Sequence, residues 1–228
     1  KVFPGLFRPA SEMPESIRQH LRYPEDLFKI QTRMYAMYHM TDPEVFYNKE
    51  DLWGLPREIY KGQQQEVSPY YVNMQLPGEP GVSFVLFTPF TPSRKDNMVA
   101  WLAVSSDADE YGRMVAFNFG KQRVVFGPMQ IEAQIDQDAE ISKMLSLWNQ
   151  SGSTVIRGNL LVYPINGSIL YVEPLFLAAQ ASQLPQLKRV IVSDGTRVEI
   201  GSDLAEALEA LVGRRTSTSA YPGIGTPS

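Results

Sequence analysis

The sequence lacks cysteine, since none of its 228 residues is one. This absence excludes disulfides, thiolate metal sites and cysteine nucleophiles, and it leaves the redox compartment open. Only two histidines occur, His20 and His39, too few for a histidine-rich metal site. The phosphate-binding loop, the dinucleotide-binding fingerprint and the Gly-x-Ser-x-Gly elbow of hydrolases are also missing. No motif therefore indicates a nucleotide-binding or serine-hydrolase activity.

Long apolar runs and an excess of basic charge are missing as well. The longest apolar run covers seven residues, Met98 to Val104, whereas a membrane helix needs about 20. The formal charge of −4 gives no basic field that would attract nucleic acid. We therefore expect no membrane span within the chain and no nucleic-acid partner. Because residue 1 is Lys1 and no signal-peptide pattern follows it, we expect a piece processed or excised from a longer protein.

Helix signals dominate the first fifty residues. Pro24, followed by two acidic residues, predicts an amphipathic helix that runs to about His39. We expect its apolar stripe to face the core, as such stripes usually do; the stripe consists of Leu27, Ile30, Met34, Met37 and Tyr38. The alternative is a binding surface formed by Met34, Tyr35, Met37 and Tyr38.

The middle of the chain has the pattern of strands. Four segments rich in Val, Phe, Tyr and Trp, separated by turn clusters, predict an antiparallel meander over residues 67–76, 82–90, 97–105 and 113–119. Further along, Asn166-Gly167 and Asp194-Gly195 each join two apolar runs, and such pairs are typical of two-residue hairpins.

Between and after these strands the apolar period changes to that of a helix. The spacing from Ile131 to Trp148 predicts one long middle helix, and Leu204, Leu208 and Leu211 predict a C-terminal one. The predicted class is therefore α+β: a mainly antiparallel sheet built from hairpins, with an N-terminal helical segment, a long middle helix and a C-terminal helix.

The composition predicts one domain and a tail. Apolar residues make up 43% and charged residues 20% of the chain, close to ordinary globular proteins. We expect a single α+β domain over residues 1–212, with a helical part at 1–56 and a sheet-and-helix part at 67–212. In residues 213–228, eleven of sixteen positions are Gly, Ser, Thr or Pro, which predicts a flexible tail.

One acidic loop is the most suggestive polar cluster. Asp107, Asp109 and Glu110 alternate before a glycine, and carboxylates in such a loop can wrap a calcium ion. The loop lacks the spacing of an EF-hand, so the alternative is a solvated strand connection that uses Asp for local hydrogen bonds. We expect no other cofactor.

Two further groups carry hypotheses of binding or catalysis. Arg94, Asn97 and Trp101 place basic and amide groups beside an aromatic ring, which can hold an anion or a carbonyl, although a plain turn explains them equally well. A second acidic stretch, Asp136, Asp138 and Glu140, is expected to form a solvated helix face.

Several segments, in order, carry a resemblance to a known family: Phe3 to Phe7, Leu21 to Phe28, Met34 to Pro43, Val45 to Asn48, Ile135 to Asp138, Gly158 to Val162 and Leu170 to Leu175. Together they resemble the large bacterial membrane proteins of uncharacterised protein family 0182, over nearly all of the chain up to Val212. The resemblance implies a longer protein with several membrane helices in its N-terminal half and a large outward-facing region, of which this chain is the C-terminal part. It supplies no catalytic residue.

These observations favour a non-enzymatic, extracytoplasmic module at the cell membrane that binds a partner or a ligand. The expected partners are the membrane-spanning remainder of the same protein, another protein, or a second copy of the chain. Enzymatic activity stays open, although the missing catalytic motifs argue against it. The alternatives are an envelope-acting hydrolase domain that uses paired carboxylates such as Asp107, Asp109, Asp136 or Asp138, and a structural cap on the membrane part.

Overall fold

The computed structural model describes residues 5–120, 123–150, 152–165, 167–179 and 184–213. The chain divides into two compact units whose segments alternate along the sequence: Lys1–Gly54, Ser68–Phe90 and Ala100–Asn118 form the first, and Leu55–Val67, Thr91–Val99 and Phe119–Ser228 form the second. The single domain over residues 1–212 stays a prediction. All of the predicted tail except Gly213 lies outside the described residues.

Helices open the first unit, as the prolines predict. The elements are η1 (Ala10–Glu12), α1 (Glu15–Arg18), α2 (Glu25–Tyr38) and α3 (Pro43–Asn48). The side chain of Asp42 accepts hydrogen bonds from the backbone nitrogens of Glu44 (2.8 Å) and Val45 (3.2 Å) and so starts α3. None of the helices in the described part of the chain has the length and apolar content needed to cross a membrane.

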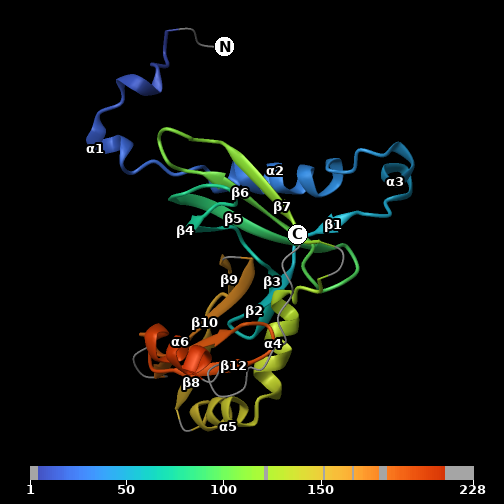
Figure 1. Ribbon diagram of the computed structural model, residues 1–228. Coiled ribbons are helices and arrows are strands. Elements are labelled where there is room, and N and C mark those ends of the chain that lie inside the picture. The colour runs from blue at the N-terminus through green and yellow to red at the C-terminus, as the bar shows by residue number, and fades with distance from the viewer. Residues whose placement is uncertain (1–4, 121–122, 151, 166, 180–183, 214–228) are drawn as a thin grey trace, which may run out of the picture. The chain divides into compact units, whose positions relative to one another are not determined.

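An antiparallel sheet forms the rest of the first unit and confirms the predicted meander (Figure 1). Its strands are β1 (Trp53–Gly54), β4 (Tyr70–Gln75), β5 (Val82–Pro92), β6 (Ala100–Ser105) and β7 (Met114–Asn118). The strand order is β1-β5-β6-β7, and β4 also pairs with β5. Every residue of β6 is buried, as expected for a short, continuously apolar strand with a neighbour on each side.

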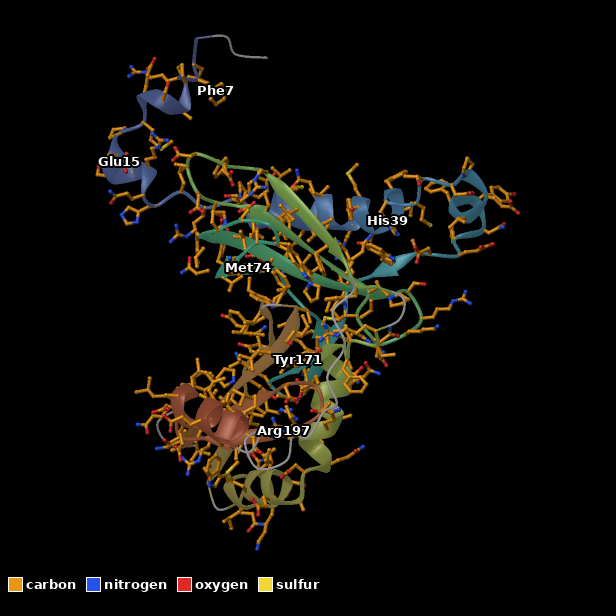
Figure 2. The ribbon with its side chains drawn as sticks, in the orientation of Figure 1. Phe7, Glu15, His39, Met74, Tyr171 and Arg197 are labelled. Atoms are coloured by element: carbon orange, nitrogen blue, oxygen red, sulfur yellow. The ribbon has the colours of Figure 1, made fainter. Side chains whose placement is uncertain are left out.

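One side of α2 packs into the first unit through small and aromatic residues. Phe28 and Thr32 are fully buried, and Ala36 is nearly so. The ring of Tyr35 lies 6.2 Å from that of Trp53. His39, labelled in Figure 2, lies just beyond the end of the helix. Its ring stacks on that of Trp53 with 3.7 Å between ring centroids. These contacts fix which side of the helix faces inward.

The other side of α2 corrects the sequence prediction. The stripe expected to be core is exposed: Leu27 44%, Ile30 59%, Met34 55%, Met37 38% and Tyr38 64%. The helix carries apolar residues on two sides, and the side that contains Phe28 is the buried one. The expected core position of this stripe was therefore wrong, and its residues are available as a surface.

In its described residues, the second unit contains a hairpin, a five-stranded sheet and three helices. They are β2 (Arg57–Tyr60), β3 (Gln63–Glu66), α4 (Pro128–Gln137), α5 (Ala139–Trp148), β8 (Ser153–Arg157), β9 (Leu161–Ile165), β10 (Ser168–Ala179), β11 (Gln186–Ser193), β12 (Val198–Gly201) and α6 (Leu204–Gly213). The larger sheet has the order β12-β11-β10-β8, with β9 also paired to β10, and its strand pairs are antiparallel. Helix α6 packs Ala207 and Leu211 against Val190 and Val192 of β11. The α+β class is confirmed.

The predicted long middle helix is two helices. Asp138 has extended backbone angles, φ −68° and ψ 121°, and ends α4. Its carboxylate accepts hydrogen bonds from the backbone nitrogens of Glu140 (3.0 Å) and Ile141 (2.9 Å), which starts α5. Aspartate satisfies free backbone N–H groups at a helix start better than it fits a helix interior. Apolar spacing alone therefore missed the break.

The two predicted hairpins differ in length. Ser168 pairs with Ile165, which confirms a two-residue connection, although Asn166 lies outside the described residues. In the second, Ser193 pairs with Val198, so four residues form the connection. There the Asp194 carboxylate accepts from the backbone nitrogens of the two residues after Gly195, at 2.9 and 3.0 Å. This local hydrogen bonding by an aspartate lengthens the turn.

Candidate functional site

The acidic loop between β6 and β7 has the geometry of a strand connection. Asp107 accepts a hydrogen bond from the backbone nitrogen of Phe84 (2.9 Å). Asp109 pairs with Arg18 at 2.6 Å, and Glu110 pairs with Arg113 at 2.7 Å. Within the described residues, no three acidic or histidine side chains gather in a way that could hold a metal ion. Each of the three carboxylates already has a protein partner. Calcium binding at this loop stays a prediction.

A cavity of about 370 Å³ lies beside this loop in the first unit. Its lining consists of Glu15, Arg18, Gln19, Leu21, Arg22, Asn73, Phe84, Ser106, Asp107 and Ala108. The guanidinium of Arg22 lies 4.2 Å from the Phe84 ring centroid, and Arg18 is paired with Asp109. Two arginines and two carboxylates balance each other in the lining, so the cavity favours neither an anionic nor a cationic ligand.

The three residues proposed to hold an anion or a carbonyl do not share one unit. Trp101 belongs to the first unit, is 2% exposed and packs on Phe117 and Phe87 at centroid distances of 5.4 and 5.6 Å. Arg94, exposed, and Asn97, half-buried, belong to the second unit. The Trp101 ring thus contributes packing, and anion binding by Arg94 and Asn97 stays a prediction.

Among the helices in the described residues, α2 carries the most exposed large apolar side chains, and they lie on its outer side. We call it the α2 face: Leu27, Ile30, Met34, Met37 and Tyr38 together with Phe46 of α3, whose ring stacks on that of Tyr38 at 5.7 Å. The first four residues follow a spacing of three, four and three, which places them along one side of the helix. Apolar side chains that are exposed together along one side of a helix are typical of an interaction site.

A buried ion cluster lies in the second unit, centred on Arg157 at the end of β8. The guanidinium binds Glu173 of β10 through two hydrogen bonds, from Nε to Oε1 (2.6 Å) and from Nη2 to Oε2 (2.9 Å). Its Nη1 donates to Asp136 (2.6 Å) and its Nη2 also donates to Glu132, both on α4. Glu132 and Glu173 are fully buried. One cation therefore holds three carboxylates.

A fourth carboxylate, Glu58 of β2, is buried close to this cluster. It accepts hydrogen bonds from the side chains of Gln65 and Asn159, both at 2.9 Å, and from the backbone nitrogen of Leu160 at 3.1 Å. Burial raises the pKa of Glu58 above its ordinary value, and these three hydrogen bonds offset part of the effect. The charge of Glu58 also acts on Glu173.

The two buried glutamates on Arg157 have strongly perturbed protonation. Burial and, to a lesser degree, the negative charge of Glu173 raise the pKa of Glu132, and Arg157 opposes them; the net result is a pKa of about 8. Burial also raises the pKa of Glu173, against the hydrogen bonds and charge of Arg157. A desolvated carboxyl beside a like charge favours its neutral form.

Sequence reasoning missed Glu58, Glu132, Arg157 and Glu173. A signal was present, because Arg157 and Glu173 are each the one charged residue of an otherwise uncharged strand. Glu132 lies four residues before Asp136 and thus on the same side of α4. Asp136 was expected on a solvated helix face; its side chain is 51% exposed, and the sequence did not predict its ion pair with Arg157.

Comparison with known proteins places the chain in a family. The model of Uncharacterised protein family (UPF0182) matches residues 1–148. A UPF0182 protein of Desulforamulus reducens is 52% identical over 227 residues, which is 100% of this chain and 24% of that protein. UPF0182 proteins of Pelotomaculum thermopropionicum and Methanospirillum hungatei are each 54% identical, over 93% and 94% of this chain and 23% and 24% of their own lengths.

The chain thus spans about a quarter of the length of these relatives. No solved structure matches it. The resemblance noted in the sequence is confirmed, and the chain belongs to the uncharacterised protein family UPF0182.

Proposed function

We propose that the chain is a non-enzymatic module on the extracytoplasmic side of a multi-pass membrane protein, and that its α2 face binds the remainder of that protein. The exposed apolar surface of α2 is the observation that carries the proposal. The position outside the membrane and the membrane anchor are taken from the family resemblance and are part of the proposal.

The chemistry of the α2 face suits an apolar groove. Its apolar side chains recur along one side of a helix, as they do in helices that bind in hydrophobic grooves. The six side chains are 37–64% exposed, and burying such a side chain from full exposure contributes about 1.5–3 kcal/mol. Covering what is still exposed therefore contributes about 1 kcal/mol for each side chain. This sum is modest for two separate molecules, because association carries an entropic cost.

The α2 face is large enough for docking when its partner belongs to the same polypeptide chain. The relatives are about four times as long as this chain, and a linked partner reaches an effective concentration in the mM range. A face of about six side chains then supports stable docking within one protein. The covalent link therefore favours the remainder of the same protein over a second copy or a separate partner.

The hydrolase alternative has no comparable support. It needs two carboxylates that face a cavity and are free to exchange protons. Asp138 caps α5, Asp136 is paired with Arg157, and Asp107, which does line the cavity, is bound to a backbone nitrogen. We therefore do not propose this function.

The test is site-specific photo-cross-linking in the full-length protein. A photoreactive amino acid replaces Met34 in the α2 face, and in a matched control it replaces Lys29, which lies about 140° around the same helix. The proposal expects cross-linked peptides that join position 34, and not position 29, to segments outside this chain. Cross-links only to a second molecule, or equal yields at both positions, would contradict it.

A further inference from the structure

The Arg157 cluster contains more negative than positive groups. Around the guanidinium lie Glu173 of β10, and Glu132 and Asp136 of α4, with Glu58 of β2 behind them. The side chains of Glu132 and Glu173 are fully buried and that of Arg157 is 11% exposed, while that of Asp136 is 51% exposed. Solvent can therefore compensate the charge of Asp136 but not that of the two glutamates.

The hydrogen-bond geometry brings the two buried carboxylates together. Nη2 of Arg157 donates to Oε2 of Glu173 and also to Oε2 of Glu132. Two ionised carboxylates on one guanidinium nitrogen would leave a net negative charge in the interior, where uncompensated charge is costly. A single proton on the pair removes that excess and leaves one balanced ion pair, as in other carboxylate pairs that share a site.

We propose that the Arg157 cluster is a proton-binding site, in which Glu132 and Glu173 share one proton at neutral pH, and that releasing this proton to water at alkaline pH weakens the packing of α4. Glu132 is the link to that packing. Its Oε1 accepts a hydrogen bond from the backbone nitrogen of Ile59 in β2 (3.4 Å). The groups that face the site are Asp136 and Glu132 from α4, Arg157 from β8, Glu173 from β10 and Glu58 from β2, with the neutral Gln65 and Asn159.

The direction of the pH dependence follows from the raised pKa values. The pKa of Glu132 is about 8 in the folded chain against an ordinary value of 4.5. Between these values the folded state holds a proton that the unfolded state has released, so stability falls as pH rises. The stabilisation by this proton is complete below about pH 4.5 and is lost by about pH 8. The proposal is independent of the docking of the α2 face, which lies in the other unit.

The experiment compares the wild-type chain with Glu132→Gln across pH 5 to 9. Glutamine has nearly the size and shape of glutamate but no titratable carboxyl, so the variant cannot bind or release the proton at position 132. Denaturant unfolding of the wild-type chain should show an unfolding constant that rises, relative to that of Glu132→Gln, by about tenfold per pH unit between pH 5.5 and 7.5. The control Asp136→Asn removes the exposed carboxylate on the same arginine and should keep the wild-type slope.

Infrared spectroscopy of the folded chain provides a readout that does not depend on the variant's stability. At pH 7 the wild-type chain should show the carbonyl band of a protonated carboxylic acid, and this band should fall to about half near pH 8 and to about a tenth near pH 9. Glu132→Gln should lack it and Asp136→Asn should retain it. Equal pH slopes for wild type and Glu132→Gln, or no carboxylic acid band in the wild-type chain at pH 7, would overturn the proposal.

Discussion

Arg157 and Glu173 form a two-fold hydrogen-bonded ion pair between the neighbouring strands β8 and β10, with the Glu173 carboxylate fully buried. Arg157 of β8 lies directly opposite Leu175 of β10. Glu173 comes two residues before Leu175 on β10, so it is the diagonal neighbour of Arg157. The long arginine side chain reaches across this offset, and its planar guanidinium then matches both carboxylate oxygens. The pair ties the sheet to α4, since the same guanidinium also binds Glu132 and Asp136.

Replacing Arg157 should destabilise the chain strongly. Arg157→Met keeps most of the side-chain volume but leaves buried carboxylates without a cation, a loss that typically costs about 3–5 kcal/mol. Adding Glu173→Gln to this variant should restore part of the stability, because it removes one of the buried charges. The free energy of unfolding by urea measures both effects. Arg113→Met, at the exposed pair with Glu79 and Glu110, is the control and should stay close to wild type.

Gly158 should not tolerate a side chain. Its backbone nitrogen donates to the carbonyl of Pro174 (2.9 Å), and a Cβ atom there would lie 2.7 Å from Pro174 Cγ and 3.3 Å from Phe176 Cε2. Gly158→Ala must therefore displace β8 or β10, and we expect a loss of about 1–3 kcal/mol in unfolding free energy. At Gly81 a Cβ would meet nothing within 4 Å. A Gly81→Ala variant that loses as much would show that space is not the cause.

The sequence predicted where helices and strands form better than it predicted which side of each is buried. Asn166-Gly167 specified its hairpin because the connection depends on two local residues. The orientation of α2 could not be derived, since both of its sides carry apolar residues and the rings of Trp53 and Phe90 decide which is buried. The Arg157 cluster could not be assembled from the sequence, because its members come from four elements that only the fold brings together.

The break at Asp138 depends on its side chain. Asp138→Ala removes the acceptor for two backbone N–H groups at the start of α5, and loss of such a cap costs about 0.5–2 kcal/mol. Thermal unfolding should show a correspondingly lower midpoint. Asp138→Ser, which retains a capping oxygen, should recover most of the loss. If alanine and serine have the same midpoint, the backbone and not the carboxylate sets the break.

Substitutions on the buried side of α2 should lower the stability of the chain, whereas substitutions on its exposed side should not. Phe28 is fully buried, so Phe28→Ala should reduce the unfolding free energy of the chain by about 3–5 kcal/mol. Met34 is 55% exposed, and Met34→Lys should change that stability by less than about 0.5 kcal/mol, as surface substitutions usually do. In the full-length protein, Met34→Lys should instead weaken docking, because a lysine charge in an apolar groove must be desolvated. Limited proteolysis detects this as faster cleavage near the α2 face, with Lys29→Met as the control that changes charge on another side of the helix. Unchanged proteolysis of the Met34→Lys protein would mean that the α2 face is not where this module binds.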